Sequence, residues 1–412
     1  MNRTAMSLHV LQEYTPEGTR RILQLANLRD QKNPLEIFFD MVGDHQAPLP
    51  RVLDGFVFAI LFYAMQLGQD IQVHGTMSGD ALRNLNEFQE AWVLWRPQLY
   101  QKIQVIPDEV TDGINPSREG AIAAFSGGVD SIFTLLRHGT KQFGAASYPL
   151  KKTALMVHGF DVPLNKPEQF ESLQCRTEPL LSELGIELKT IRTNLKELEL
   201  QGWEDSSMTQ LAGCLHNYSH QFSYGLVGST ESYDALILPW GSNPATDHLL
   251  SGAALSIIHD GAGYSRTAKV EQIARHATAA SVVKVCWEGQ ETSKNCGECE
   301  KCVRTLLNFL AVGVSNPPCF SKPLDKRQIR ALILRNDTVH GELKSIVNYA
   351  KAKGITEDWL LELDKRVKKY KGPTFIQKHT PRLQKAWALA QRGEWHQLAG
   401  KVKMKALGDR AA

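Results

Sequence analysis

The sequence predicts an α/β protein: a doubly wound parallel sheet, with an α/β region before it and a mainly helical region after it. Short apolar strands alternate with helices from Ala121 onward, a glycine-rich loop follows the first of these strands, and a cysteine cluster closes the series. Such alternation is typical of a parallel sheet with helices on both faces. Because 412 residues exceed one ordinary domain, we expect three regions, 1–115, 116–320 and 321–412.

The first region is predicted to be an α/β unit, to which we assign no role. The expected strands are 35–39, 71–75 and 102–106, and the expected helices are 49–67 and 78–96. Its longest apolar run, 56–65, is shorter than the roughly 20 residues that a membrane helix needs. Since no secretory signal is recognisable either, we expect a cytoplasmic protein without a membrane partner.

The second region holds the predicted parallel sheet. Its expected strands are 121–125, 154–158, 186–191 and 235–238. The stretches between them, 132–138, 167–184 and 208–226, are predicted to be helices that serve as right-handed crossovers. Beyond the cysteines a further helix is expected around 306–310, and the rest of the chain has little strand character.

The glycine-rich loop is the segment Ser126-Gly127-Gly128-Val129-Asp130-Ser131. A strand that runs through such a loop into a helix points backbone N–H groups and a helix N-terminus at one spot, which suits a phosphate. The two glycines allow close approach, the two serines can donate hydroxyls, and Asp130 can hold Mg²⁺. A glycine-rich turn with a capping Ser or Asp is the alternative interpretation.

Four of the seven cysteines lie close together, in the pattern C-x9-C-x2-C-x2-C formed by Cys286, Cys296, Cys299 and Cys302. In a reducing compartment, clustered thiols indicate a metal site more than disulfides. Four thiolates suit a tetrahedral, closed and therefore structural Zn²⁺ site. An iron–sulfur cluster and buried reduced cysteines are the alternatives.

The motif SGGVDS after a strand resembles the PP-loop of the N-type ATP pyrophosphatases. Between this loop and the cysteines lies a segment similar to the K-x-E-x-[IV] segment of the 7-cyano-7-deazaguanine synthases. It is Lys269-Val270-Glu271-Gln272-Ile273. Together the three features make residues 120–312 resemble 7-cyano-7-deazaguanine synthase, with N- and C-terminal extensions. The resemblance implies a HUP fold, also called adenine nucleotide alpha hydrolase-like.

The resemblance also implies an activity and a set of residues. ATP would be cleaved to AMP and pyrophosphate, and a carboxylate or amide would be activated for transfer to a nitrogen nucleophile. ATP, Mg²⁺ and Zn²⁺ would be the cofactors. Asp130 and Lys269 would be catalytic, and the nucleotide would contact the loop residues Ser126, Gly127, Gly128, Val129, Asp130 and Ser131 together with His158, Arg266 and Lys269.

A polar segment after the last expected strand is the candidate substrate site, because ligands bind at the carboxyl ends of parallel strands. The candidate residues are Gly241, Ser242, Asp247 and His248, although Asp247 is as well suited to capping a helix. The substrate would be a small-molecule or peptide carboxylate. The segment does not match the deazaguanine-binding segment of the synthases, so the substrate stays open.

The C-terminal region is strongly basic, with 21 Lys/Arg against 9 Asp/Glu from Lys322 onward. It could bind RNA or a protein, or be a solvated helical surface; a homodimer also stays open. Two other functions compete with the adenylating enzyme. One is an RNA-modifying sulfur transferase, if Cys175 or Cys214 carried a persulfide instead of packing in the core. The other is an inactive nucleotide-sensing or scaffold module.

Overall fold

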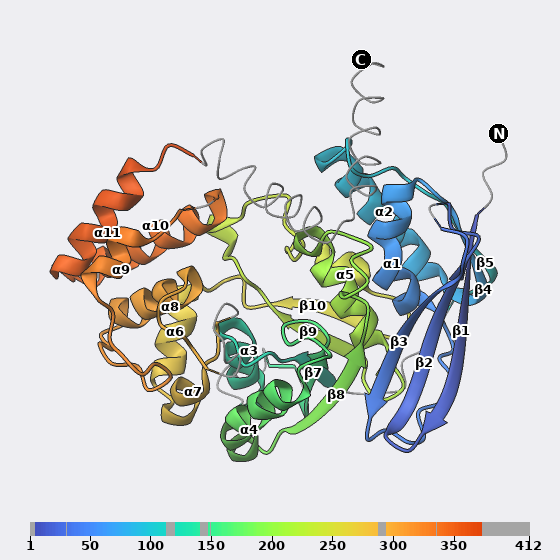
Figure 1. Cartoon of the computed structure of the whole chain (residues 1–412), viewed down its shortest axis with the longest axis horizontal. Helices are drawn as coiled ribbons and strands as arrows, with labels where there is room; N and C mark the ends of the chain where they lie inside the picture. Colours follow the sequence, from blue (N-terminus) through green and yellow to red (C-terminus); the bar gives the residue numbers. More distant parts are fainter. Residues whose placement is uncertain are drawn as a thin grey trace. The chain divides into compact units, whose positions relative to one another are not determined.

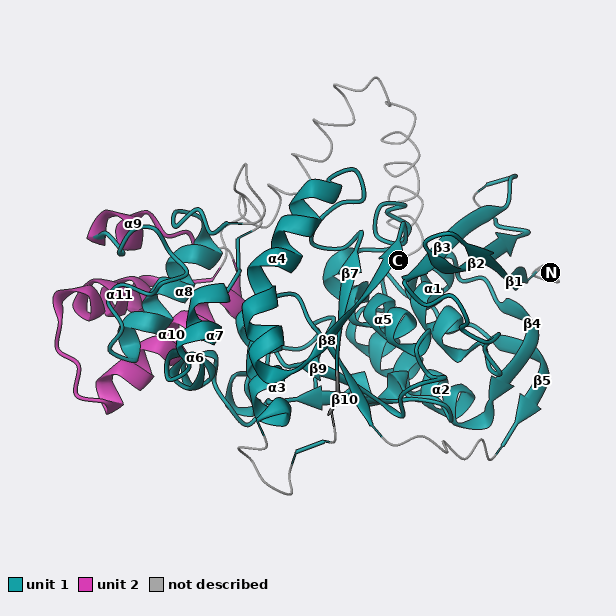
Figure 2. Cartoon of the chain, turned by 90° about the horizontal axis from the view of Figure 1, so that it is seen from below, with its two compact units in different colours: residues 1–325 teal, residues 326–412 magenta. Residues whose placement is uncertain are grey.

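The structure is a computed structural model that describes residues 5–29, 31–112, 120–140, 147–148, 150–286, 294–334 and 336–372. Figure 1 labels its helices and strands. The chain divides into two compact units, residues 1–325 and residues 326–412, which are coloured separately in Figure 2. The sequence places an additional division near residue 115, but the first 325 residues form one unit because one sheet runs through them.

Unit 1 is organised by a ten-stranded sheet in the order β10-β9-β6-β7-β8-β3-β2-β1-β4-β5. Five neighbours are mutually parallel: β6 (Ala121–Ala124), β7 (Leu150–His158), β8 (Glu187–Thr193), β9 (Tyr224–Gly228) and β10 (Ser256–Asp260). The chain starts at β6, adds β7 and β8 on one side, and then adds β9 and β10 on the other. The winding direction therefore reverses between β6 and β9, whose carboxyl ends lie side by side.

The N-terminal strands extend this sheet rather than building another. The strands are β1 (Met6–Thr15), β2 (Gly18–Ala26), β3 (Leu35–Val42), β4 (Ile71–Ser78) and β5 (Val105–Thr111). β1, β2 and β3 form an antiparallel meander, and β4 and β5 add to it in parallel beside β1. β3 joins the two halves by pairing antiparallel with β8, with Phe39 opposite Thr193.

Helices pack against both faces of the sheet. One face carries α1 (Asp54–Leu67), α2 (Gly79–Trp95) and α5 (Trp203–His216); the other carries α3 (Val129–Gly139), α4 (Pro167–Leu184), α6 (Arg266–Ala274), α7 (Ala277–Val282) and α8 (Glu300–Ala311) (Figure 1). The short strand β6 shows the two faces directly, since Ile122 and Ala124 belong to the first core and Ala121 and Ala123 to the second. Among the described residues, no helix is long and apolar enough to cross a membrane.

The α/β class and most expected strands are confirmed, but one strand was misplaced. The run 235–238 is not a strand: it follows the short 3₁₀ helix η2 (Tyr233–Ala235), and Leu238 is exposed. The strand is β9, which overlaps the end of the stretch predicted as the helix 208–226, because that helix ends at His216. The run Gly225 to Val227 is fully buried between neighbouring strands, whereas the apolar run chosen from the sequence lies outside the sheet.

Unit 2 contains the helices α9 (Lys326–Ala331), α10 (Asp337–Ala352) and α11 (Asp358–Lys369). Two residues at the C-terminal end of α11, in the basic region, make contacts inside the unit. The ring of Tyr370 stacks on His340 with ring centroids 4.4 Å apart, and its hydroxyl donates to Asp337. Lys368 pairs with Asp364 at 2.7 Å. The rest of the basic region, from residue 373 onward, lies outside the described residues.

Candidate functional site

The glycine-rich loop lies between β6 and α3, as expected from the sequence. Gly127 has a φ of +73°, in the left-handed region that favours glycine, and a Cβ there would stand 3.2 Å from Cγ2 of Thr177. Gly128 is the N-cap of α3 and provides no side-chain cap. Ser131 Oγ donates to the Gly128 carbonyl and accepts from the Ser126 N–H. The loop therefore presents a glycine-capped helix N-terminus, a geometry that suits an anion.

Three of the predicted residues meet at this loop, although they come from distant parts of the chain. The Asp130 carboxylate pairs with Arg266 Nη1 at 2.8 Å and with Lys269 Nζ at 3.3 Å. Ser265 caps α6 by accepting from the Ala268 N–H, which sets the orientation of the helix that carries both cations. Lys269 is almost completely buried, and burial lowers its pKa, opposed by Asp130. This arrangement holds a desolvated cation beside a candidate phosphate site.

Residues at the end of β9 complete the cluster, and the sequence analysis missed them. A Cβ at Gly228 would lie 2.6 Å from the carbonyl oxygen of Asp130, so this strand end requires a glycine. Ser229 accepts from Lys269 Nζ through its hydroxyl at 2.8 Å and also through its carbonyl. The run Gly228-Ser229-Thr230, which follows a buried strand, could have predicted these residues. It was overlooked because that strand was predicted at 235–238, about ten residues too late.

A cavity of about 240 Å³ opens at the carboxyl ends of β6, β7 and β9. Its polar lining includes Ser126, Asp130, Ser131, Thr230 and Ser242. Its apolar lining includes Phe160, Phe170, Trp203, Met208 and Leu211. The glycine-rich loop therefore shares one cavity with apolar side chains, three of which belong to α5. A mainly apolar cavity with a few convergent polar groups is the usual form of a small-molecule site.

Asp161, which the sequence analysis did not select, also lines this cavity. Burial raises the pKa of its carboxyl, and Lys196, Lys301 and Lys284 oppose that shift from a distance. Lys196 has the largest opposing effect of the three, but its ammonium group is bound elsewhere. It donates to the Phe160 carbonyl at 2.8 Å and lies 4.0 Å from the Trp203 ring centroid. Within the described part of the chain Asp161 has no hydrogen bond or ion pair, so its carboxylate can accept from a ligand.

His158 does not join the site. It lies at the end of β7, but its Nε2–H donates to the Pro163 carbonyl at 3.0 Å and its ring stacks on Phe170 at 4.4 Å. It is not among the residues that line the cavity. The side chain therefore holds the loop after β7 in place, and its contact with a nucleotide stays a prediction.

Of the four candidate substrate residues, only Ser242 lines the cavity. Asp247 is buried and accepts from Ser242 Oγ at 2.7 Å and from the Asn243 N–H at 2.9 Å, while its other contact is His259 Nδ1 at 2.7 Å. These bonds make Asp247 an organiser of its own loop. His248 is exposed in the short 3₁₀ helix η3 (Asp247–Leu250), and Gly241 allows close approach to the Glu204 carbonyl.

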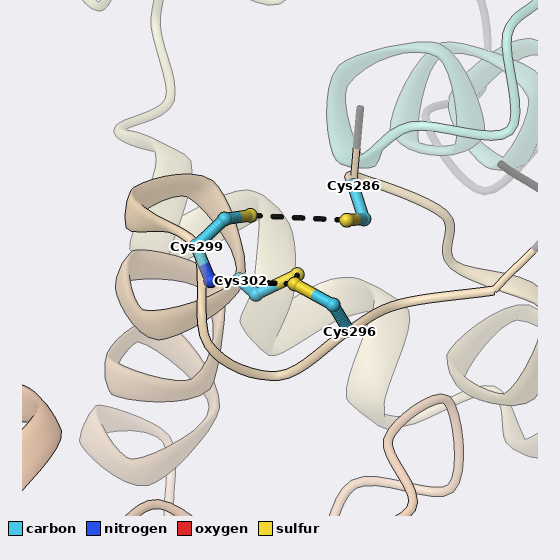
Figure 3. Close-up of side chains that lie close together, drawn as sticks. All are labelled: Cys286, Cys296, Cys299 and Cys302. Atoms are coloured by element: carbon cyan, nitrogen blue, oxygen red, sulfur yellow. Dashed lines mark hydrogen bonds between the residues drawn. The ribbon is translucent and has the colours of Figure 1, made fainter. Parts of the chain in front are cut away.

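The four cysteines of the cluster converge, as Figure 3 shows. Sγ atoms are 3.8 Å apart in the pairs Cys286–Cys299 and Cys296–Cys302, and all four lie within 4.8 Å of one another. A tetrahedral ion with Zn–S bonds of about 2.3 Å separates its sulfur ligands by about 3.8 Å, whereas a disulfide needs about 2.05 Å. The N–H groups of Glu298 and Cys299 donate to Cys296 Sγ. The cluster could therefore hold a metal ion such as zinc.

The cysteines proposed as persulfide carriers lie apart from the cavity. Cys214 is a residue of α5 that is buried in the core, and burial raises its pKa. Cys175 is exposed on α4, contrary to the expectation that it packs in the core. Neither residue lines the cavity.

Residues 247–383 match a family described as "Family of unknown function (DUF6395)". The matched range includes Lys269 and the four clustered cysteines but not the glycine-rich loop. No curated protein and no solved structure matches the chain.

Proposed function

We propose that this protein is an adenylating enzyme of the N-type ATP pyrophosphatase superfamily, similar to 7-cyano-7-deazaguanine synthase. In this proposal the parallel half of the sheet is a doubly wound, HUP-like nucleotide-binding fold. Its strand order supports this, because the glycine-rich loop follows β6 at the reversal of winding, where such folds bind ligands. The observation that carries the proposal is the convergence of Arg266 and Lys269 on Asp130 at that loop.

These residues suit cleavage of ATP between its α and β phosphates. The serine hydroxyls and backbone N–H groups of the loop would bind the phosphates that leave as pyrophosphate. Asp130 has the hard oxygen ligands that Mg²⁺ prefers, and the bound ion would neutralise phosphate charge. Binding of the nucleotide would then transfer Arg266 and Lys269 from Asp130 to the phosphate oxygens. The contribution of these residues is positioning and electrostatic stabilisation of the departing charge.

The apolar lining of the cavity supports a second substrate with an apolar or planar body. A carboxylate oxygen of this substrate would attack the α-phosphorus, and the bond from that phosphorus to the bridging oxygen of pyrophosphate would break. A nitrogen nucleophile would then attack the acyl carbon, AMP would leave, and the nitrogen would lose a proton. Asp161 is the candidate acceptor for that proton, because it lines the same cavity and has no partner among the described residues. A deazaguanine acid is the first candidate substrate, and a peptide carboxylate is the second.

The four-cysteine cluster is, in this proposal, a zinc knuckle with a structural role. Four protein ligands close the coordination sphere, so the site leaves no position for a substrate. Cys286 comes from the segment after α7, whereas Cys299 and Cys302 begin α8. The ion would therefore join two segments of unit 1.

The proposal is tested by incubating the protein with Mg²⁺, ATP labelled in the α-phosphate and a panel of carboxylic acids, with and without ammonium. We expect AMP and pyrophosphate in equal amounts, formed only with a suitable acid, and mass spectrometry should find the adenylate or amide. Formation of ADP and phosphate would overturn the proposal. Nucleotide binding without turnover would favour the sensing module, and a product that requires RNA would favour sulfur transfer.

A further inference from the structure

A short extended segment connects the cysteine cluster to the glycine-rich loop. This segment, residues 283–286, follows α7 and ends at Cys286; we refer to it as the anchor segment. The N–H of Lys284 donates to the Gly127 carbonyl at 2.8 Å. A Cβ on Gly127 would lie 3.7 Å from Lys284 Cβ, and one on Gly128 would lie 3.7 Å from the Lys284 carbonyl oxygen. The anchor segment therefore packs directly on both glycines of the loop.

Asn295, which directly precedes Cys296, binds the anchor segment through hydrogen bonds. The Asn295 Oδ1 accepts from the N–H groups of Val285 at 2.9 Å and Cys286 at 3.3 Å. Its Nδ2 donates to the Val283 carbonyl at 2.9 Å. Lys284 Nζ donates to the Cys286 carbonyl, and both residues are fully buried. Backbone polar groups are thus bound along the anchor segment, and the bonds come from residues next to metal-ligand positions.

We propose that the four-cysteine centre sets the conformation of the nucleotide loop, and that Asn295 and Lys284 are the positioning residues that transmit it. An ion bound by all four thiolates fixes Cys286 relative to Cys296, which places Asn295 against the anchor segment. The Lys284 N–H then holds the Gly127 carbonyl, the group that keeps the loop in its left-handed turn. Loss of the ion or of the Asn295 amide loosens the loop without removing any residue that would touch the nucleotide.

Hydrogen exchange on the full-length protein tests this directly, with Asn295→Ala as the variant. This variant keeps all four thiols, so we expect a full metal complement. Amides in peptides covering residues 125–129 and 283–286 should exchange at least tenfold faster than in the wild type, while amides of β7 and β8 stay unchanged. Chelation of the metal from the wild type should accelerate the same two peptides.

Asn194→Ala is the matched control. Asn194 also accepts from one backbone N–H, that of Phe38, and donates to one carbonyl, that of Glu36, but it does so at the junction of the two sheet halves. This variant should lose stability without changing exchange in the loop. Unchanged loop exchange in Asn295→Ala at full metal content would overturn the coupling, and so would equal acceleration in both variants.

Binding of Mg·ATP adds a second readout that rests on the proposed function. We expect Asn295→Ala to raise the Kd for Mg·ATP at least tenfold and Asn194→Ala to leave it within twofold. If the wild type does not bind Mg·ATP, the proposed function fails, while the exchange result still decides the coupling. If the wild type binds it and the loop exchanges normally in Asn295→Ala, the coupling fails and the proposed function stands.

Discussion

Charged side chains of the two halves of the sheet can have different surroundings. In the half built from β1 to β5, Asp54 accepts from both the N–H and the hydroxyl of Ser78, and Arg21 donates to Gln12, Asn217 and Pro48. These groups are bound within the protein and hold elements together. In the parallel half, the partly buried Asp130 and Asp161 line a cavity that a ligand can enter. A charged side chain can therefore serve either the architecture or the chemistry of a protein, and access to a cavity indicates the second role.

The largest effect is expected at Asp130, where the comparison predicts loss of activity without loss of fold. Asp130→Ala removes the group that would hold Mg²⁺ and pair with both cations, so pyrophosphate release should fall by at least about 100-fold. Asp130→Asn, which keeps the size of the side chain, should be similarly impaired. Pyrophosphate assays together with circular dichroism and metal analysis check this. If either variant releases pyrophosphate at the wild-type rate, the glycine-rich loop has no part in the mechanism.

A comparably large effect, but on folding, is expected at the cysteine cluster. The purified protein should contain about one Zn²⁺ per chain, and Cys299→Ser should lose both the metal and most soluble expression, because a structural site supplies folding free energy. Metal analysis and expression yield are the measurements. If the protein instead contains iron and absorbs visible light, the cysteines bind an iron–sulfur cluster and not zinc. A soluble, metal-free wild type would show that the thiols need no ion.

A more selective effect, confined to one step of the reaction, is expected at Asp161. Asp161→Asn keeps the shape of the side chain but cannot take a proton, so transfer to the nitrogen nucleophile should slow by about 10²- to 10⁴-fold, the range of general-base catalysis. Acid-dependent exchange of labelled pyrophosphate into ATP should continue near the wild-type rate, because it precedes that step. Equal loss of both reactions would place Asp161 in ATP binding instead.

The smallest effect concerns stability in the architectural half. His216 is the last residue of α5, and its ring packs against Phe58 of α1. It donates to the Leu250 carbonyl at 2.9 Å, and burial lowers its pKa to about 4 from the ordinary 6.5. Because the folded pKa lies below the unfolded one, the stabilisation is present above pH 6.5 and is lost as the pH falls toward 4. Between pH 7 and 5 the free energy of unfolding should drop by about 2 kcal/mol. Urea titrations of wild type and His216→Gln measure this, and an equal drop in both would rule out His216 as the cause.

How much of the site the sequence could predict depended on how far apart its parts lie in the chain. The glycine-rich loop is continuous, so its position between β6 and α3 followed from the order of residues. The misplaced fourth strand had a local cause, since two apolar runs compete around residues 224–238 and only one is buried in the sheet. That error hid Ser229 and Thr230 and directed attention to Asp247, whose side chain is used inside its own loop.

The sequence by itself determined the features that local order encodes: the α/β class, the glycine-rich loop, and the spacing of four cysteines that could hold a metal. Tertiary structure alone decided which distant groups meet. It brought Arg266 and Lys269 to Asp130, gave Asp161 access to the cavity, turned His158 toward Pro163, and joined the N-terminal strands to the same sheet. The physical reason is that periodicity and spacing report burial and backbone geometry along the chain, whereas strand order and close packing between segments far apart in the sequence determine which side chains face one another.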